Sequence, residues 1–337
     1  MNMHNPEAHL VENLFSDAIN CAPTRDGFGT GVVEAGEADE RIVVLCADLS
    51  ESTRAESFAK RFPDRFVEVG IAEQNMAALA AGFAAALKVP FTASYAAFNP
   101  GRNYEHIRTT IALGNANVKV CGMHAGVSVG PDGATHQMLE DIGMMRMLPN
   151  MTVINPADAE EARKAVRAAA EMTTPVYLRF GRAATPVFTT RETPFTAGKA
   201  LTLWESEKPR VALLATGSMA YRALLAARTL EADGVGTIVL NVHTIKPLDA
   251  AAILSAARRT GHVVTVEEHQ VAGGFGSAVA ELLARAYPVP MRMLGIQDQF
   301  GQSGEPDELL EHYGLGVGHI VDAVHSLDRS VRARAIL

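Results

Sequence analysis

Short apolar runs rich in β-branched residues alternate along this chain with longer Ala-rich segments of helical period. These runs cover residues 42–45, 91–95, 118–120 and 151–154, and later 211–214, 237–240 and 262–266. Strands that alternate with helices in this way are typical of βαβ units, in which neighbouring strands pair in parallel. The sequence therefore predicts an α/β fold with mostly parallel sheets covered by helices.

The alternation lapses once, in a stretch rich in Thr and Pro between residues 183 and 196. A chain of 337 residues corresponds to about two domains. We therefore expect two tandem doubly wound domains that meet at this break. The predicted layout is an N-terminal extension over 1–23, a first domain over 24–184, a linker over 185–205 and a second domain over 206–337.

Charge and cysteine usage exclude several classes of protein. The chain carries 38 acidic against 30 basic residues, a net charge of −8, so a field that attracts nucleic acid or an anionic membrane is not expected. The most apolar stretch, residues 77–87, is about half as long as a membrane span, and the first residues do not resemble a secretory signal. Cys21, Cys46 and Cys121 are odd in number and widely spaced, which favours a reducing cytoplasm over disulfides or zinc.

One carboxylate begins the most Ala-rich helix that the sequence predicts. Glu73 follows an apolar run at 66–69 and lies in the first turn of a helix that continues through residue 87, which we expect to be buried. A first-turn acid complements the helix dipole, which is the plainer interpretation. Apolar surroundings would also favour a protonated carboxyl that shares its proton with a ring nitrogen. Spacing alone leaves both interpretations open.

The densest polar segment lies at residues 122–137 and combines His124, Asp132 and His136 with several Gly and Pro residues. Imidazoles and a carboxylate on such a rigid loop suit acid–base chemistry and hydroxyl recognition. A metal site is the weaker interpretation, because no helical i,i+4 spacing presents the three side chains. A single histidine here would be interpreted as structural, whereas the three residues together favour a functional site.

These segments and others resemble the carboxy-terminal half of transketolase, in particular the second subunit of split transketolases. The resemblance covers nearly the whole chain from Thr24 onward, and each motif is weak alone but specific in this order. It implies a pyrimidine-binding domain followed by the transketolase carboxy-terminal domain. The motifs are TRDGFG at 24–29, ADLSEST at 47–53, FPDRF at 62–66, GIAEQN at 70–75, DGATHQ at 132–137, PNM at 149–151, EEH at 267–269, GGFG at 273–276 and DQFGQSG at 298–304.

The resemblance implies thiamine diphosphate as the cofactor and the transfer of a two-carbon ketol unit from a ketose phosphate to an aldose. Glu73 matches the acid that hydrogen-bonds the aminopyrimidine of the cofactor. Tyr95 and Phe98 match aromatic residues that stack around that ring, although ordinary core packing also accounts for them. Together with Glu73, His124 and His136 are the catalytic candidates that the resemblance indicates.

The same resemblance assigns residues to the sugar substrate. His124, Asp132 and His136 match contacts to donor hydroxyls, to the reacting carbonyl oxygen and to the acceptor. Arg25, Ser52 and Arg179 match positions that hold the sugar phosphate, a role that suits the bidentate guanidinium group. Arg182 ranks below Arg179, since it would either share that work or lie in solvent.

Departures from the family pattern affect two parts of the site. Pro131 stands where many full-length transketolases have an acid, and Gly101 or Arg102 falls near a place where some carry a further aromatic residue. The sequence from Pro131 to Gly133, followed by Asn155, imitates the Gly-Asp-Gly…Asn pattern that holds magnesium and diphosphate. We reject that match, because the first Gly is Pro131 and because Asn155 is the expected N-cap of the next helix.

The chain would need a second polypeptide to act on thiamine diphosphate. The 23 residues before Thr24 are too few to fold a domain that holds Mg²⁺ (or Ca²⁺) and diphosphate. The resemblance therefore implies a separate subunit that supplies this domain and most of the metal site, in an α2β2 assembly. It also implies self-association through both domains of this chain and a metal-free set of site residues here.

Three alternatives stay open on the sequence alone. The chain resembles, less closely, the β subunit of a thiamine-dependent 2-oxo-acid dehydrogenase and a deoxyxylulose-phosphate-synthase-like ligase. A non-catalytic protein that stabilises or regulates a transketolase is the third. The ketose donor and the aldose acceptor do not follow from the motifs, because residues of the pocket wall set such choices.

Overall fold

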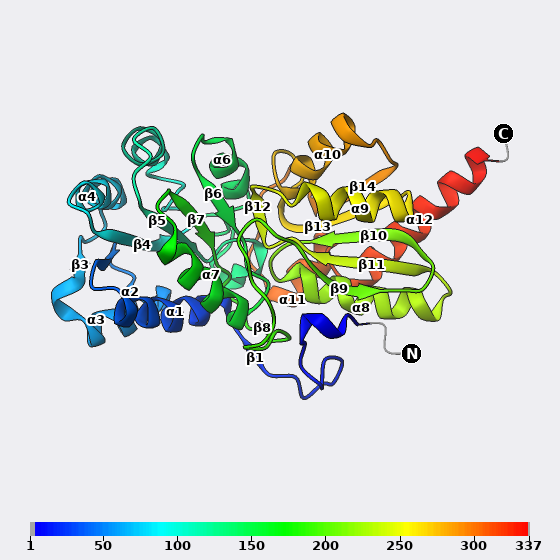
Figure 1. The fold of residues 1–337 in the computed structure, drawn as a ribbon, viewed down its shortest axis with the longest axis horizontal. Coiled ribbons are helices and arrows are strands. Elements are labelled where there is room, and N and C mark those ends of the chain that lie inside the picture. The colour runs from blue at the N-terminus through cyan, green and yellow to red at the C-terminus, as the bar shows by residue number, and fades with distance from the viewer. Residues whose placement is uncertain (1–3, 336–337) are drawn as a thin grey trace.

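The computed structural model describes residues 4–335 and contains two large sheets that lie end to end along the long axis of the molecule (Figure 1). Helices cover both faces of each sheet, so the prediction of two tandem α/β domains is confirmed. Within the described residues, no helix is long and apolar enough to cross a membrane.

The first sheet has seven strands in the order β12-β6-β7-β5-β4-β2-β3. Its strands pair in parallel, except that β12 runs antiparallel to β6. Because β12 comes from the second half of the chain, the two domains share a strand. The bounds are β2 (Ile42–Cys46), β3 (Phe66–Glu68), β4 (Val89–Tyr95), β5 (Lys119–Met123), β6 (Thr152–Ile154), β7 (Val176–Arg179) and β12 (Thr244–Lys246).

Alternate residues of the central strands reach two different cores. In β2, Ile42 and Val44 pack with the helices of one face, and Val43 and Leu45 pack with those of the other. The first face carries α1 (Thr24–Ala38), α3 (Glu56–Arg61) and α7 (Ala159–Glu171). The second carries α4 (Glu73–Ala85), α5 (Tyr104–His106), the π-helix η3 (Ile107–Ala112) and α6 (Asp141–Met147).

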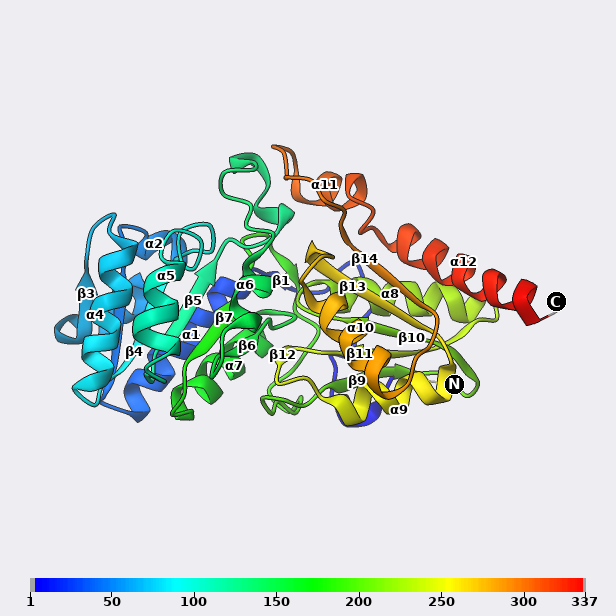
Figure 2. The same cartoon turned by 90° about the horizontal axis from the view of Figure 1, so that it is seen from above.

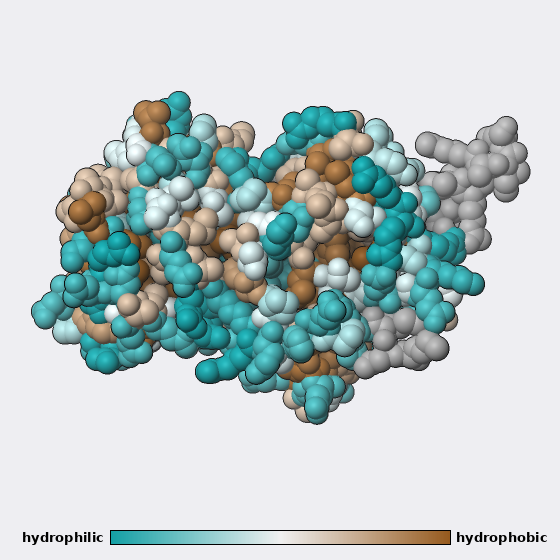
Figure 3. Space-filling view, viewed as in Figure 1, coloured by the Kyte–Doolittle hydropathy of each residue, from teal (hydrophilic) through white to brown (hydrophobic). Residues whose placement is uncertain are grey.

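The sequence predicted that helix α4 is buried. The structure shows that only one of its sides is buried. Met76, Ala77 and Ala80 pack against the sheet, whereas Leu79 lies on the outer side and Leu87, just beyond the helix, is 80% exposed. Apolar atoms are visible over α4 at the left end of the molecule (Figure 3). The sequence could not distinguish the buried side of α4 from its exposed side, because both sides consist of Ala and other apolar residues.

The second sheet has five strands in the order β14-β13-β10-β11-β9, of which only β9 is antiparallel to its neighbour. Helices α8 and α12 cover one face, and α9 and α10 cover the other. The strands are β9 (Leu201–Glu205), β10 (Pro209–Ala215), β11 (Gly236–Asn241), β13 (Val263–Gln270) and β14 (Met291–Ile296). The helices are α8 (Met219–Ala232), α9 (Ala250–Thr260), α10 (Phe275–Ala286), α11 (Pro306–His312) and α12 (Val317–Ala335).

The predicted linker is too long at its second end. Residues 201–205 form β9 and belong to the second sheet, so the connecting segment ends before Leu201. Sequence reasoning missed this strand because no helix follows it and because it lies at an edge. Earlier in the connecting segment, β8 (Thr185–Pro186) pairs antiparallel with β1 (Cys21–Ala22).

The N-terminal extension lies on the second domain rather than beside the domain that follows it in sequence. The Asn5 backbone N–H donates to the Leu203 carbonyl at 3.0 Å. The Tyr221 hydroxyl of α8 donates to the Leu14 carbonyl at 2.8 Å, and Leu14 is buried. The extension therefore packs on the second domain before the chain enters α1 of the first domain.

Helix α7 begins three residues later than predicted. Its N-cap is Asp158, whose carboxylate accepts from the Glu161 backbone N–H at 2.8 Å. Asn155 instead points across the domain junction, where its amide lies 3.4 Å from the Thr216 hydroxyl. Asp158 is held in the N-cap position because its carboxylate also accepts from the backbone N–H groups of Phe188 and Thr189.

Candidate active site

The carboxyl ends of four parallel strands meet at one edge of the first sheet, which is where α/β folds commonly bind ligands. Asp48 follows β2, Tyr95 ends β4, His124 follows β5 and Arg182 follows β7. Arg25 reaches the same edge from the first turn of α1. The topology thus brings together residues that are up to 157 positions apart. The Gly181 backbone N–H, next to Arg182, donates to the hydroxyl of Thr24, next to Arg25.

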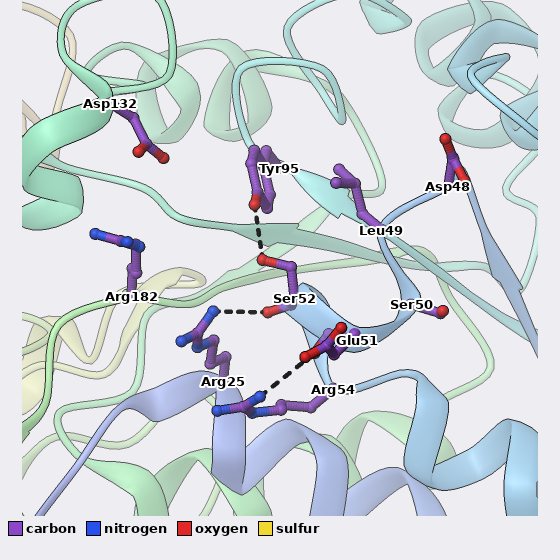
Figure 4. A pocket seen from close by; sticks show the side chains of 10 residues that line it. All are labelled: Arg25, Asp48, Leu49, Ser50, Glu51, Ser52, Arg54, Tyr95, Asp132 and Arg182. Atoms are coloured by element: carbon purple, nitrogen blue, oxygen red, sulfur yellow. Dashed lines mark hydrogen bonds between the residues drawn. The ribbon is translucent and has the colours of Figure 1, made fainter.

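A cavity of about 650 Å³ opens at this edge (Figure 4). Three guanidinium groups and three carboxylates stand around it, together with hydroxyl groups of α2 (Ser50–Thr53). Its size suits a small polar metabolite. The lining residues are Arg25, Asp48, Leu49, Ser50, Glu51, Ser52, Arg54, Tyr95, Asp132 and Arg182.

Arg25 stands in the wall of the cavity and is bound to two neighbouring groups. Its Nη1 donates to the Ser52 carbonyl at 2.8 Å and lies 3.2 Å from Nε2 of His124. Its Nε atom has no hydrogen-bond partner within the part of the chain that the structure describes. Burial and then the nearby Arg54 lower the pKa of Arg25. A multivalent anion in the cavity would relieve this repulsion.

His124 is held as a neutral imidazole against Tyr95. The two rings stack with centroids 3.9 Å apart, and the Tyr95 hydroxyl lies 2.7 Å from the Ser52 hydroxyl. Burial, followed by the positive charge of Arg25, lowers the pKa of His124 to about 3. Since Arg25 can only donate, Nε2 accepts and the proton lies on Nδ1, which is buried without a partner among the described residues.

The loop with Asp132 and His136 is supported by the second domain. His136 lies edge-on to the Phe98 ring at 5.5 Å, and its Nδ1 lies 2.9 Å from the Thr135 hydroxyl. Gln137, next in sequence, donates from Nε2 to the Gln302 carbonyl of the second domain at 2.9 Å. Figure 2 shows α11 of that domain beside this loop, whose 3₁₀ turn η4 (Val127–Asp132) contacts α11.

Glu73 lies behind the aromatic residues at the first position of α4 and is only 2% exposed. Its Oε2 accepts from Nη1 of Arg102 at 2.9 Å. The Arg102 guanidinium lies over the Phe98 ring, 4.6 Å from its centroid, and Phe98 in turn stacks with Tyr95 at 6.0 Å. A buried carboxylate that is linked through Arg102 to two stacked rings is a suitable setting for a flat ring with N–H donors.

The structure does not bring Arg179, which was predicted to hold the sugar phosphate, to the wall of the cavity. This side chain is buried, and its Nε donates to the Asp141 carboxylate at 2.8 Å while Nη2 donates to the Glu268 carbonyl at 2.9 Å. Arg182 is the arginine that lines the cavity, with Nη1 bound to the Val129 carbonyl at 2.7 Å.

Of the other predicted site residues, Arg25, Ser52, Tyr95 and Asp132 line the cavity. Phe98, His124 and His136 contact Tyr95, and Glu73 is linked to Phe98 through Arg102. Sequence reasoning missed Arg54, which lines the cavity two positions after Ser52 and is bound to Asp26 at 2.7 Å. It also gave no role to Arg102. Within residues 4–335, no three His, Cys, Asp or Glu side chains are grouped to hold a metal.

Comparison with known proteins places this geometry in a family. Residues 21–187 match the family described as transketolase, pyrimidine binding domain, and residues 198–320 match transketolase, C-terminal domain. A subunit of 6-deoxy-6-sulfo-D-fructose transketolase from Clostridium sp. is 41% identical, covering 90% of this chain and 94% of the relative. One of the subunits of apulose-4-phosphate transketolase from Phocaeicola vulgatus is 38% identical, covering 88% and 95%.

A solved structure is also similar. It is described as a split gene transketolase in the form of an inactive beta4 tetramer. Its TM-score is 0.84 at 44% sequence identity, and the match covers 90% of this chain and 98% of that one.

Proposed function

The chain belongs to the transketolase family, and we propose that it is the β-type subunit of a split enzyme that transfers a two-carbon ketol unit from a ketose phosphate to an aldose. The observation that carries this proposal is the continuous path of contacts from an arginine-lined cavity, through Tyr95, Phe98 and the intervening Arg102, to the buried carboxylate of Glu73. Such a path provides for a sugar phosphate at one end and for a planar cofactor ring at the other.

The residues of this chain fit the pyrimidine end of thiamine diphosphate. Glu73 would accept a ring N–H or share a proton with the ring, and Phe98 and Tyr95 would contact the flat faces. When bound, the cofactor supplies the carbanion chemistry of ketol transfer. The contribution of the chain is to hold the ring in one orientation and to set the proton on its nitrogen through the carboxyl of Glu73.

The cavity fits the sugar phosphate. Arg25, Arg54 and Arg182 present guanidinium groups to a phosphate, which takes bidentate hydrogen bonds from such groups. His124 is neutral, so it would contact the sugar without supplying a charge. Asp132 and His136 would bind hydroxyl groups of the donor and the acceptor from their supported loop.

A separate subunit would supply the diphosphate and Mg²⁺ site, giving an α2β2 assembly in the cytoplasm. Relatives described as transketolase subunits support a partner of this kind. The exposed apolar outer face of α4 supports self-association of this chain, because monomeric surfaces seldom leave such helix faces uncovered. The three cysteines are free thiols, in keeping with a reducing compartment.

Replacement of Glu73 tests the proposal. The complex is purified with the partner subunit, and turnover is followed with a panel of ketose phosphates. We expect Glu73→Gln to lower kcat by about 10²–10⁴-fold, the usual contribution of a positioned acid or base. Glu56→Gln, the same charge change at a solvent-facing ion pair with Lys60, should leave turnover unchanged. Full activity of Glu73→Gln would refute the catalytic role and favour a non-catalytic partner protein.

A further inference from the structure

Arg102 stands between Glu73 and solvent. It lies in the turn before α5, and its side chain is 44% exposed, whereas the side chain of Glu73 is 2% exposed. The next residue, Asn103, donates from its amide to the Glu73 backbone carbonyl at 2.9 Å, which fixes the turn against the start of α4. Arg102 therefore reaches the buried carboxylate from the outer side, and the turn that carries it is anchored independently of the ion pair.

The guanidinium uses two partners at once. It donates to Glu73 at 2.9 Å, and it lies 4.6 Å from the centroid of the Phe98 ring. A planar group that donates N–H to a carboxylate while lying over an aromatic ring satisfies the same two requirements as an aminopyrimidine. One ring face and one buried carboxylate cannot serve both groups simultaneously.

Resting on the proposed function, we propose that Arg102 is a further residue of the cofactor site, which holds the place of the pyrimidine ring and is displaced by it. Within the described residues, the side chain of Arg102 has no hydrogen-bond partner besides Glu73, so its release breaks one ion pair and one ring contact. Its exposed position leaves a route outward into solvent.

This arrangement also accounts for the buried charge. A carboxylate removed from water is costly unless a cation or several donors accompany it. Arg102 supplies that cation for Glu73. The ion pair therefore keeps the carboxylate ready for a ring donor, but the cofactor must compete with the pair in order to bind.

The competition predicts an unusual gain on mutation. If the site is open to the cofactor only in the fraction of molecules that have released Arg102, the apparent Kd is raised by the inverse of that fraction. Arg102→Met keeps the length of the side chain and removes both the charge and the donors. We expect this variant, in the complex with the partner subunit, to bind thiamine diphosphate roughly tenfold more tightly in calorimetry.

Two further variants control for charge and folding. Arg108→Met removes an exposed arginine six positions away, and we expect the Kd for thiamine diphosphate to be unchanged. Arg102→Lys keeps the charge but loses the planar fork, so its affinity should lie between those of the wild type and Arg102→Met. The KM for the ketose phosphate should stay constant in all three, because Arg102 does not line the sugar cavity.

Equal or weaker cofactor binding by both Arg102 variants would overturn the displacement proposal while leaving the proposed function intact. Tighter binding by Arg102→Met than by the wild-type complex, with an unchanged Kd in Arg108→Met, would support it. If no variant and no wild-type complex binds thiamine diphosphate, the proposed function itself fails, and the displacement proposal fails with it.

Discussion

Arg179 and Arg182 are three residues apart, yet they belong to two charged regions of opposite character. Arg182 lines the open cavity and is tied to the protein by one backbone carbonyl. Arg179 lies in the junction between the domains, where a carboxylate and two carbonyls surround it. The cavity therefore keeps spare donors for a ligand, whereas the junction pairs its charges within the protein. The same residue type serves binding in one region and stability in the other.

The largest effect is expected when the buried cation of Arg179 is removed. Arg179→Met leaves the Asp141 carboxylate without its cation in a fully buried place. We expect a loss of about 3–5 kcal/mol in the free energy of unfolding, measured by urea titration. Adding Asp141→Asn should recover part of the loss, because the unpaired charge is then gone.

A stable Arg179→Met protein with a raised KM for ketose phosphate would contradict the structural role assigned to Arg179. It would return Arg179 to the substrate site that the sequence first indicated.

The matching change in the cavity should affect binding rather than stability. Arg182→Met removes one donor from the group of three arginines. Loss of a charged hydrogen bond costs about 1.5–3 kcal/mol, so the KM for a ketose phosphate should rise roughly 10–100-fold. The KM for a ketose without phosphate should hardly change. An equal increase for both sugars would show that Arg182 does not contact the phosphate.

A buried histidine provides a second test of the closed domain junction. Burial lowers the pKa of His243, which precedes β12 and stacks on Phe195 at 4.3 Å, from 6.5 to about 4. Below pH 6.5 the unfolded chain binds a proton that the folded chain does not. The contribution of His243 to stability is therefore complete above pH 6.5 and is lost as the pH falls through about 4.

Between pH 7 and pH 5 this loss should amount to about 2 kcal/mol. His243→Gln should reduce the pH dependence of unfolding by that amount. An unchanged pH profile in this variant would mean that His243 is protonated equally well in the folded chain, and the junction would then be less closed than its geometry indicates.

The periodicity of the sequence was sufficient for the long strands but not for the short edge strands. Runs such as 42–45 and 211–214 carry enough apolar residues to indicate buried strands in both sheets. In contrast, β12 has three residues between His243 and Pro247, and its register depends on β6, which lies about 90 positions earlier. Strands of this kind are specified by the partner edge, and the partner edge is not visible in local sequence.

The site followed a similar division. Motif positions indicated Arg25, Ser52, Tyr95 and Asp132, which the sheet edge brings together. What could not be predicted were contacts between distant segments, such as Arg102 with Glu73, 29 positions apart. The choice between Arg179 and Arg182 depended on Asp141, which only the fold brings next to β7.

The most direct test of the account is cofactor binding by the separated and the combined subunits. The tagged chain is used to isolate its stoichiometric partner from native cell extract, and calorimetry then measures thiamine diphosphate binding in the presence of Mg²⁺. We expect no tight binding by either protein alone, and tight binding with ketol transfer by the mixture. Tight binding or turnover by this chain alone, or a mixture that binds no cofactor, would contradict it.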